Sequence, residues 1–123
     1  MRPPLQCWGY ALHEIEAISY AIAVHVDEPH PETLLARIVA DADDIDRFGP
    51  YRTLTRWGRR ALDDYAAAIE AARAHLQMCR SYQQTATMHT PTGQRLFDAQ
   101  VSWRIDFFTA LIAEHQAIHP QAK

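Results

Sequence analysis

Four aspartates crowd into one short segment, which reads Asp41-Ala42-Asp43-Asp44-Ile45-Asp46. Carboxylates this close repel one another unless a cation or a hydrogen-bond donor neutralises them. On a helix that turns about 100° per residue, Asp43 lies at the edge of the apolar stripe through Ile38 and Ile45, while Asp44 points to solvent. Asp43 therefore has the position expected of a metal ligand that projects into a cleft.

The other two aspartates of this segment have different expected roles. Asp41 is expected to lean toward solvent, as Asp44 does. Asp46 falls near the apolar stripe itself, where an isolated buried charge would be costly or would be neutralised by protonation. Because Arg52 or Arg56 on the following helix could supply the opposite charge, we predict that Asp46 forms a structural ion pair.

His25 is the natural companion of Asp43, because it follows Ile18 by seven residues and so lies on the inner side of the preceding helix. Imidazole combined with carboxylate suits manganese, iron, nickel or zinc, whereas magnesium prefers oxygen ligands alone. The competing interpretation is a histidine at a helix end that bonds a backbone carbonyl. The functional interpretation, kept beside this structural one, is a metal site at Asp43 and His25.

Helices must position these side chains, since apolar residues recur at spacings of three and four and no alternating strand pattern occurs. The pattern predicts an all-α fold of about five helices. Their expected bounds are residues 11–26, a helix from about residue 32 to the Gly49-Pro50 pair, a short helix from Tyr51 interrupted at Gly58, residues 60–82, and a helix capped by Thr90 that runs from Pro91 to about residue 116.

Apolar stripes on these helices predict which residues face the core. The first helix is expected to turn Ile15, Ile18, Ile22 and Val26 inward, and the second Leu35, Ile38, Val39, Ala42 and Ile45. The last helix carries Phe97, Val101, Ile105, Phe108 and Ile112 on one stripe, flanked by Trp103, Phe107 and Leu111. Because it is apolar on more than one face, we expect it to be central or buried against a partner.

Length and charge set the broad class. The 123 residues, 48% of them hydrophobic, suit one domain over residues 1–123, with residues 1–10 as an unassigned leader. A formal net charge of −3 argues against nucleic-acid binding. The densest positive cluster, Arg56, Arg59 and Arg60, is followed at once by Asp63 and Asp64, so a solvated helix face is preferred to a phosphate site.

The location is expected to be cytoplasmic, without a membrane partner. Pro3 and Pro4 stand where a signal peptide needs an apolar run, and no apolar stretch approaches the length of a membrane span. Cys7 and Cys79 lie far apart without metal or redox spacing. Among the remaining residues, Trp8, Trp57 and Trp103 are expected to be core anchors, and His75, His89, His115 and His119 surface residues.

Three segments together resemble the C-terminal half of the HD-domain metal-dependent phosphohydrolases. Residues 32–49 resemble the helix of the last metal aspartate, residues 14–25 a helix that ends in a histidine, and residues 88–114 the C-terminal helix. The resemblance implies an HD-like helical bundle truncated at its N-terminus. It places Asp43 at the distant metal aspartate and His25 at a histidine that binds a second metal in some members.

The chain departs from that family at its other ligands, because no His-Asp dipeptide occurs and the first histidine is missing. A metal that activates water needs about three protein ligands and an open position. The resemblance therefore implies a degenerate, non-catalytic module with a vestigial metal or phosphate pocket, and a homodimer that covers the apolar surface left by the missing helices. The alternative is an active divalent-metal-dependent phosphohydrolase acting on a phosphorylated small molecule. Its ligands would be completed by His13, His30, Glu14 or a second subunit.

Overall fold

The computed structural model describes residues 4–120, and this part of the chain is all helical, as the sequence predicts. The elements are α1 (Pro4–Cys7), α2 (Leu12–Val24), α3 (Leu34–Phe48), α4 (Pro50–Arg52), the π-helix η1 (Thr53–Gly58), α5 (Arg59–Asp63), α6 (Tyr65–Thr85) and α7 (Pro91–Ile118). None of these helices has both the length and the apolar character needed to cross a membrane.

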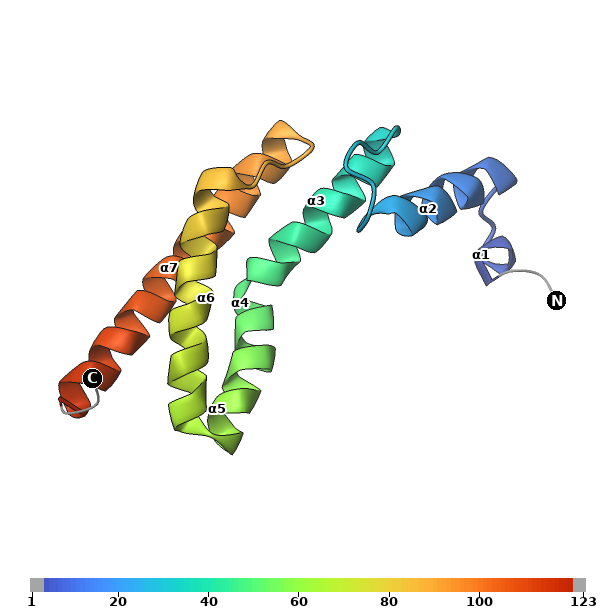
Figure 1. The fold of residues 1–123 in the computed structure, drawn as a ribbon. Coiled ribbons are helices and arrows are strands. Elements are labelled where there is room, and N and C mark those ends of the chain that lie inside the picture. The colour runs from blue at the N-terminus through green and yellow to red at the C-terminus, as the bar shows by residue number, and fades with distance from the viewer. Residues whose placement is uncertain (1–3, 121–123) are drawn as a thin grey trace.

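The longest helices, α6 and α7, lie side by side as an antiparallel pair (Figure 1). Residues 34–63, from α3 to α5, form a bent column that runs down beside α6, and α2 lies on the far side of α3. One core cluster joins α3 to both long helices through Phe48, Cys79, Phe97 and Val101, and a second joins α6 to α7 through Ala72, Leu76, Phe108 and Ile112. The column, α6 and α7 therefore make up the packed body.

The start of α7 confirms the predicted cap. The hydroxyl of Thr90 accepts a hydrogen bond from the Gly93 amide at 2.9 Å, and Pro91 occupies the first helical position. The predicted stripe is also confirmed, since Phe97, Val101, Phe108 and Ile112 are buried. A local capping signal and a strong 3.6-residue period therefore determined this helix.

The single helix predicted over residues 60–82 is wrong, because the chain turns sharply at Asp64. Asp64 is extended, with φ −152° and ψ 100°, and its carboxylate accepts a hydrogen bond from the Ala67 amide at 3.0 Å, which starts α6. An aspartate can offer its side chain to the backbone in place of a helical bond, so it favours a cap over a helix interior. Gly58, predicted as the interruption, is helical and leads directly into α5.

The inward stripes predicted for the first two helices are largely wrong. Ile22 and Val26 are 60% and 67% exposed, and Ile38 is 49% exposed. Small residues are buried instead, Ala21 on α2 and Ala36 and Ala40 on α3 among them. Helices that meet through alanines approach closely, so their larger neighbours are left outside the contact. Trp8, expected in the core, is also exposed.

A buried carboxylate ties α3 to the start of α7, which corrects the expectation of a solvated Asp41. Asp41 is only 3% exposed. One of its oxygens accepts from the His89 amide at 2.7 Å, and the other accepts from the amide and hydroxyl of Thr90 at 2.9 and 2.6 Å. The positive end of the α7 dipole adds to this stabilisation. At Gly93 a β-carbon would overlap the Asp41 carboxylate, so only glycine fits.

We expect Asp41→Ala to lower the free energy of unfolding by about 2–4 kcal/mol, because two partly buried amides and the Thr90 hydroxyl lose a charged acceptor. Asp44→Ala is the matched control, since the Asp44 side chain is 41% exposed and pairs with Arg47 at 3.5 Å. Its effect should stay within about 0.5 kcal/mol. Urea unfolding at pH 7 measures both. Equal losses in the two variants would contradict the role of Asp41.

Candidate functional site

The residues predicted to hold a metal have other partners in the structure. The Asp43 carboxylate is half-exposed and lies 3.7 Å from the Arg47 guanidinium. The Nδ1 atom of His25 lies 2.6 Å from the Ile22 carbonyl oxygen, which is the contact of the helix-end interpretation. Residues 4–120 contain no group of three His, Cys, Asp or Glu side chains that could hold a metal ion. No hydrogen bond or ion pair joins Asp43 to His25 in this part of the chain, and the metal stays a hypothesis from the sequence.

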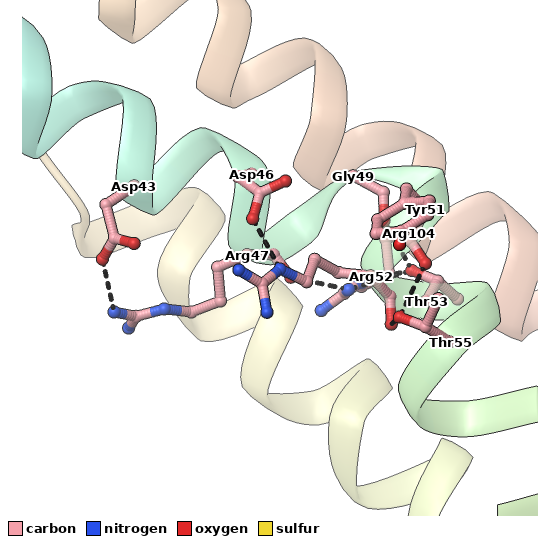
Figure 2. A network of polar contacts seen from close by, with 9 residues as sticks. All are labelled: Asp43, Asp46, Arg47, Gly49, Tyr51, Arg52, Thr53, Thr55 and Arg104. Atoms are coloured by element: carbon pink, nitrogen blue, oxygen red, sulfur yellow. Dashed lines mark hydrogen bonds and ion pairs between the residues drawn. The ribbon is translucent and has the colours of Figure 1, made fainter. Parts of the chain in front are cut away.

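The ion pair expected of Asp46 is present, with Arg52 Nε 2.5 Å from a carboxylate oxygen (Figure 2). Both side chains are half-exposed, so the pair lies at the surface and not against the apolar stripe. The hydrogen bond from Arg52, followed by the negative charge of Asp46, raises the pKa of the arginine. Arg56, the other predicted partner, has no carboxylate within salt-bridge distance among the described residues.

A cavity of about 320 Å³ lies between the α3–α5 column and α6, with α7 at its floor. We call it the arginine pocket, because five guanidinium groups line it, those of Arg47, Arg52, Arg56, Arg60 and Arg104. The other lining residues are Thr53, Trp57, His75, Met78 and Phe108. Its volume falls at the lower end of the range of ligand pockets, about 300–1,000 Å³.

Arg52, Arg56 and Arg60 follow one another at four-residue spacing along the column, through the π-helix η1. Residues at this spacing lie on one helix face, and like charges there destabilise the helix. Only Arg52 of the three has a carboxylate partner within residues 4–120. Arg56, Arg59 and Arg60 are all exposed, which confirms the predicted solvated face, and Arg56 and Arg60 also line the arginine pocket. π-Helical turns are frequent at functional sites.

Arg104 forms the floor of the arginine pocket and is only 6% exposed. Its Nη2 atom donates to the Arg47 carbonyl at 2.7 Å and to the Thr53 hydroxyl at 2.9 Å, and Nε donates to the same hydroxyl at 3.1 Å (Figure 2). The guanidinium carbon lies 5.1 Å from the centre of the Phe48 ring. The negative end of the α3 dipole and an aromatic face thus stabilise this cation.

No carboxylate neutralises Arg104 in the described part of the chain. Burial is the main cause that lowers the pKa of its guanidinium, but an arginine stays charged in proteins. Arg104 also interacts electrostatically with the thiol of Cys79. Burial raises the pKa of that thiol, so the thiol is neutral at pH 7. The floor of the pocket therefore keeps a positive charge.

His75 completes the pocket wall on α6, contrary to its expected place at the surface. Its ring stacks on Phe108, with centroids 6.1 Å apart and planes at 12°. Burial lowers the pKa of His75, and the positive charges of Arg104 and Arg60 lower it further. The imidazole is consequently neutral at pH 7. From the sequence alone, the one signal for this site was the four-residue spacing of Arg52, Arg56 and Arg60.

Comparison with known proteins gives no match, since no family model, no curated protein and no solved structure corresponds to this chain. The likeness to the HD-domain phosphohydrolases thus depends on the three sequence segments alone. The arginine pocket is the feature from which a function has to be argued.

The lowered pKa of His75 predicts how stability changes with pH. The unfolded chain takes up a proton near pH 6.5, whereas the folded chain does so only at lower pH, so stability should fall as pH drops below about 6.5. We expect His75→Gln to flatten this part of the pH profile, measured by urea unfolding between pH 7.5 and 5. His13→Gln, at an exposed histidine of α2, should keep the slope. An unchanged slope in His75→Gln would contradict the assignment.

Proposed function

We propose that this protein is a non-catalytic helical module that binds a small phosphate-bearing molecule in the arginine pocket. The observation that carries the proposal is the buried cation at the pocket floor, Arg104, which has no carboxylate partner within residues 4–120. Arg56 and Arg60 add two more unpaired guanidinium groups to the same cavity. A dianion would relieve the repulsion among all three.

Phosphate suits this arrangement better than a single carboxylate does. Guanidinium groups bind phosphate oxygens through paired, charge-assisted hydrogen bonds, and a phosphate group offers three terminal oxygens to several donors. The remaining wall is apolar and aromatic, with Trp57, Met78 and Phe108. The preferred ligand is therefore a phosphomonoester whose phosphate meets the arginines and whose flat apolar part lies against these side chains.

Binding without hydrolysis agrees with the lining of the pocket, which contains no carboxylate. Its one hydroxyl belongs to Thr53, which donates to the Gly49 carbonyl at 3.0 Å and accepts from Arg104. Because this hydroxyl donates its proton to a backbone carbonyl, it is not hydrogen-bonded to His75, the imidazole in the same pocket that could activate it as a nucleophile. The carboxylates of Asp43 and Asp46 lie beside Arg47, Arg52 and Arg56 at a neighbouring hollow, where they contact Arg47 and Arg52.

In the same proposal the module is a degenerate HD-like protein that acts as a homodimer. Three segments in family order support the first part, and large exposed apolar side chains such as Leu54 and Leu96 support the second. The phosphate pocket of this proposal is the arginine pocket, not the neighbourhood of Asp43 and His25.

Isothermal titration with phenyl phosphate tests the binding site. We expect the Arg56→Gln/Arg60→Gln double variant to bind at least tenfold more weakly, since each charge-assisted bond contributes roughly 1.5–3 kcal/mol and about 1.4 kcal/mol is tenfold. Arg59→Gln removes a charge from the same helix outside the pocket, so it should change the affinity less than twofold. Inorganic phosphate should bind more weakly than phenyl phosphate. Equal losses of affinity in both variants would mean that net charge sets the affinity, and this result would contradict the proposed site.

A turnover assay separates binding from catalysis. With manganese or nickel and p-nitrophenyl phosphate, chelator-free protein should give no rate above that of the buffer, because the pocket offers one imidazole, that of His75, and no carboxylate to complete a metal site. A metal-dependent rate that Asp43→Ala abolishes and Asp44→Ala preserves would overturn the non-catalytic assignment. That result would establish the alternative, a divalent-metal-dependent phosphohydrolase.

A further inference from the structure

An uncovered apolar surface extends along the side of the molecule where the α3–α5 column meets α7. We call it the α3/α7 face, and its most prominent exposed side chains are Leu34, Ile38, Tyr51, Leu54, Leu96 and Trp103. Two hollows lie on it, one of about 440 Å³ beside Ile38 and Leu96 and one of about 330 Å³ beside Leu54 and Trp103. Large aromatic and aliphatic groups are thus presented around ready-made depressions.

The sequence pattern marks this face as one that should be buried. On α3, Leu34, Ile38 and Ile45 recur at spacings of four and seven, which is the pattern of a helix stripe that packs against another surface. In the single chain two of the three, Leu34 and Ile38, are exposed. An amphipathic stripe that its own chain leaves in solvent indicates a protein partner.

The matching stripe of α7 is free of charge over five turns. It runs through Thr92, Leu96, Gln100, Trp103, Phe107 and Leu111, and no Asp, Glu, Lys or Arg belongs to it. Trp103 and Phe107 stack on this stripe, with ring centroids 5.4 Å apart and planes at 10°. A charged partner would find no opposite charge here, whereas an identical uncharged face meets no like-charge repulsion.

The chain exposes more surface than a compact monomer of its mass, as expected if a second subunit covers part of it. The chain exposes 8768 Å² at a mass of 14.1 kDa, whereas a compact monomer of that mass exposes about 6,700 Å². The excess is about 2,000 Å², part of which belongs to the projecting α2, and a standard interface needs about 800 Å² from each partner. The excess exposed area is therefore large enough for one dimer interface on the α3/α7 face.

We propose that the α3/α7 face is the dimer interface and that its occupant is the same face of a second copy. Two helical elements from each copy would then pack as a four-helix arrangement about a twofold axis. This inference rests on the proposed self-association and not on phosphate binding. The two surfaces are neighbours, however, because Trp57 and Thr53 line both the arginine pocket and the hollow beside Leu54 and Trp103. Dimerisation would hold one wall of the pocket in place.

Sedimentation velocity from about 1 to 100 µM tests the inference. The wild-type chain should be a dimer, and Leu54→Glu and Leu96→Glu should each weaken dimerisation at least tenfold, because each places a charge against its own copy. Both side chains are exposed, so the variants should keep the wild-type circular dichroism and thermal midpoint. Leu62→Glu on α5 is the matched control, since it replaces an equally apolar leucine that is 89% exposed outside the face.

Each other outcome decides a separate question. A wild-type monomer over the whole range would overturn both the self-association and the face. A dimer that survives Leu54→Glu and Leu96→Glu but is weakened by Leu62→Glu, or by Leu12→Glu on α2, would overturn the face alone. Phenyl phosphate titration of the Leu96→Glu monomer keeps the pocket separate, since Leu96 lies outside it and binding should persist within a few fold.

Discussion

The architecture depends on a buried guanidinium without a carboxylate partner in the described chain, that of Arg104. Such a charge cannot be neutralised by losing its proton, so its surroundings must stabilise it with fixed dipoles. The last turn of α3, the Thr53 hydroxyl and the Phe48 ring do this together. The same contacts tie the end of α3 and the start of η1 to α7, and so bring Arg56 and Arg60 beside the charged floor of the pocket.

A second buried charge, the carboxylate of Asp41, acts at the opposite end of the α3/α7 contact. The anion lies at the N-terminus of α7, and the cation lies at the C-terminus of α3, which is the sign that each helix dipole favours. The two long-range ties hold α3 parallel to α7. These polar ties and the buried Phe48 hold α3 against α7, while Leu34 and Ile38 remain on the outer face.

The two sides of the α3–α5 column therefore have opposite characters. One side faces α6 and carries positive charge around the arginine pocket, while the other faces away with uncharged aromatic and aliphatic groups. The aspartates that suggested a metal occupy the rim of the charged side, where Asp43 and Asp46 pair with Arg47 and Arg52. Because these carboxylates pair with Arg47 and Arg52, the pocket arginines without a carboxylate partner in residues 4–120 are Arg56, Arg60 and the buried Arg104. Trp57 connects the two sides, with its indole N–H donating to the Ala68 carbonyl at 2.9 Å.

The sequence by itself determined the helical class, the Thr90-Pro91 start of α7, the buried stripe of that helix and the short-range pairing of Asp46 with Arg52. Each of these depends on residues close together in the sequence, where periodicity, capping preferences and nearby opposite charges act. Only the tertiary structure decided that Asp41 is buried and that His75 and Arg104 meet the column. These contacts join residues about 50 apart, such as Asp41 with Thr90 and Thr53 with Arg104. A helical period says which face a residue occupies, but which element covers that face is decided by packing across the whole chain.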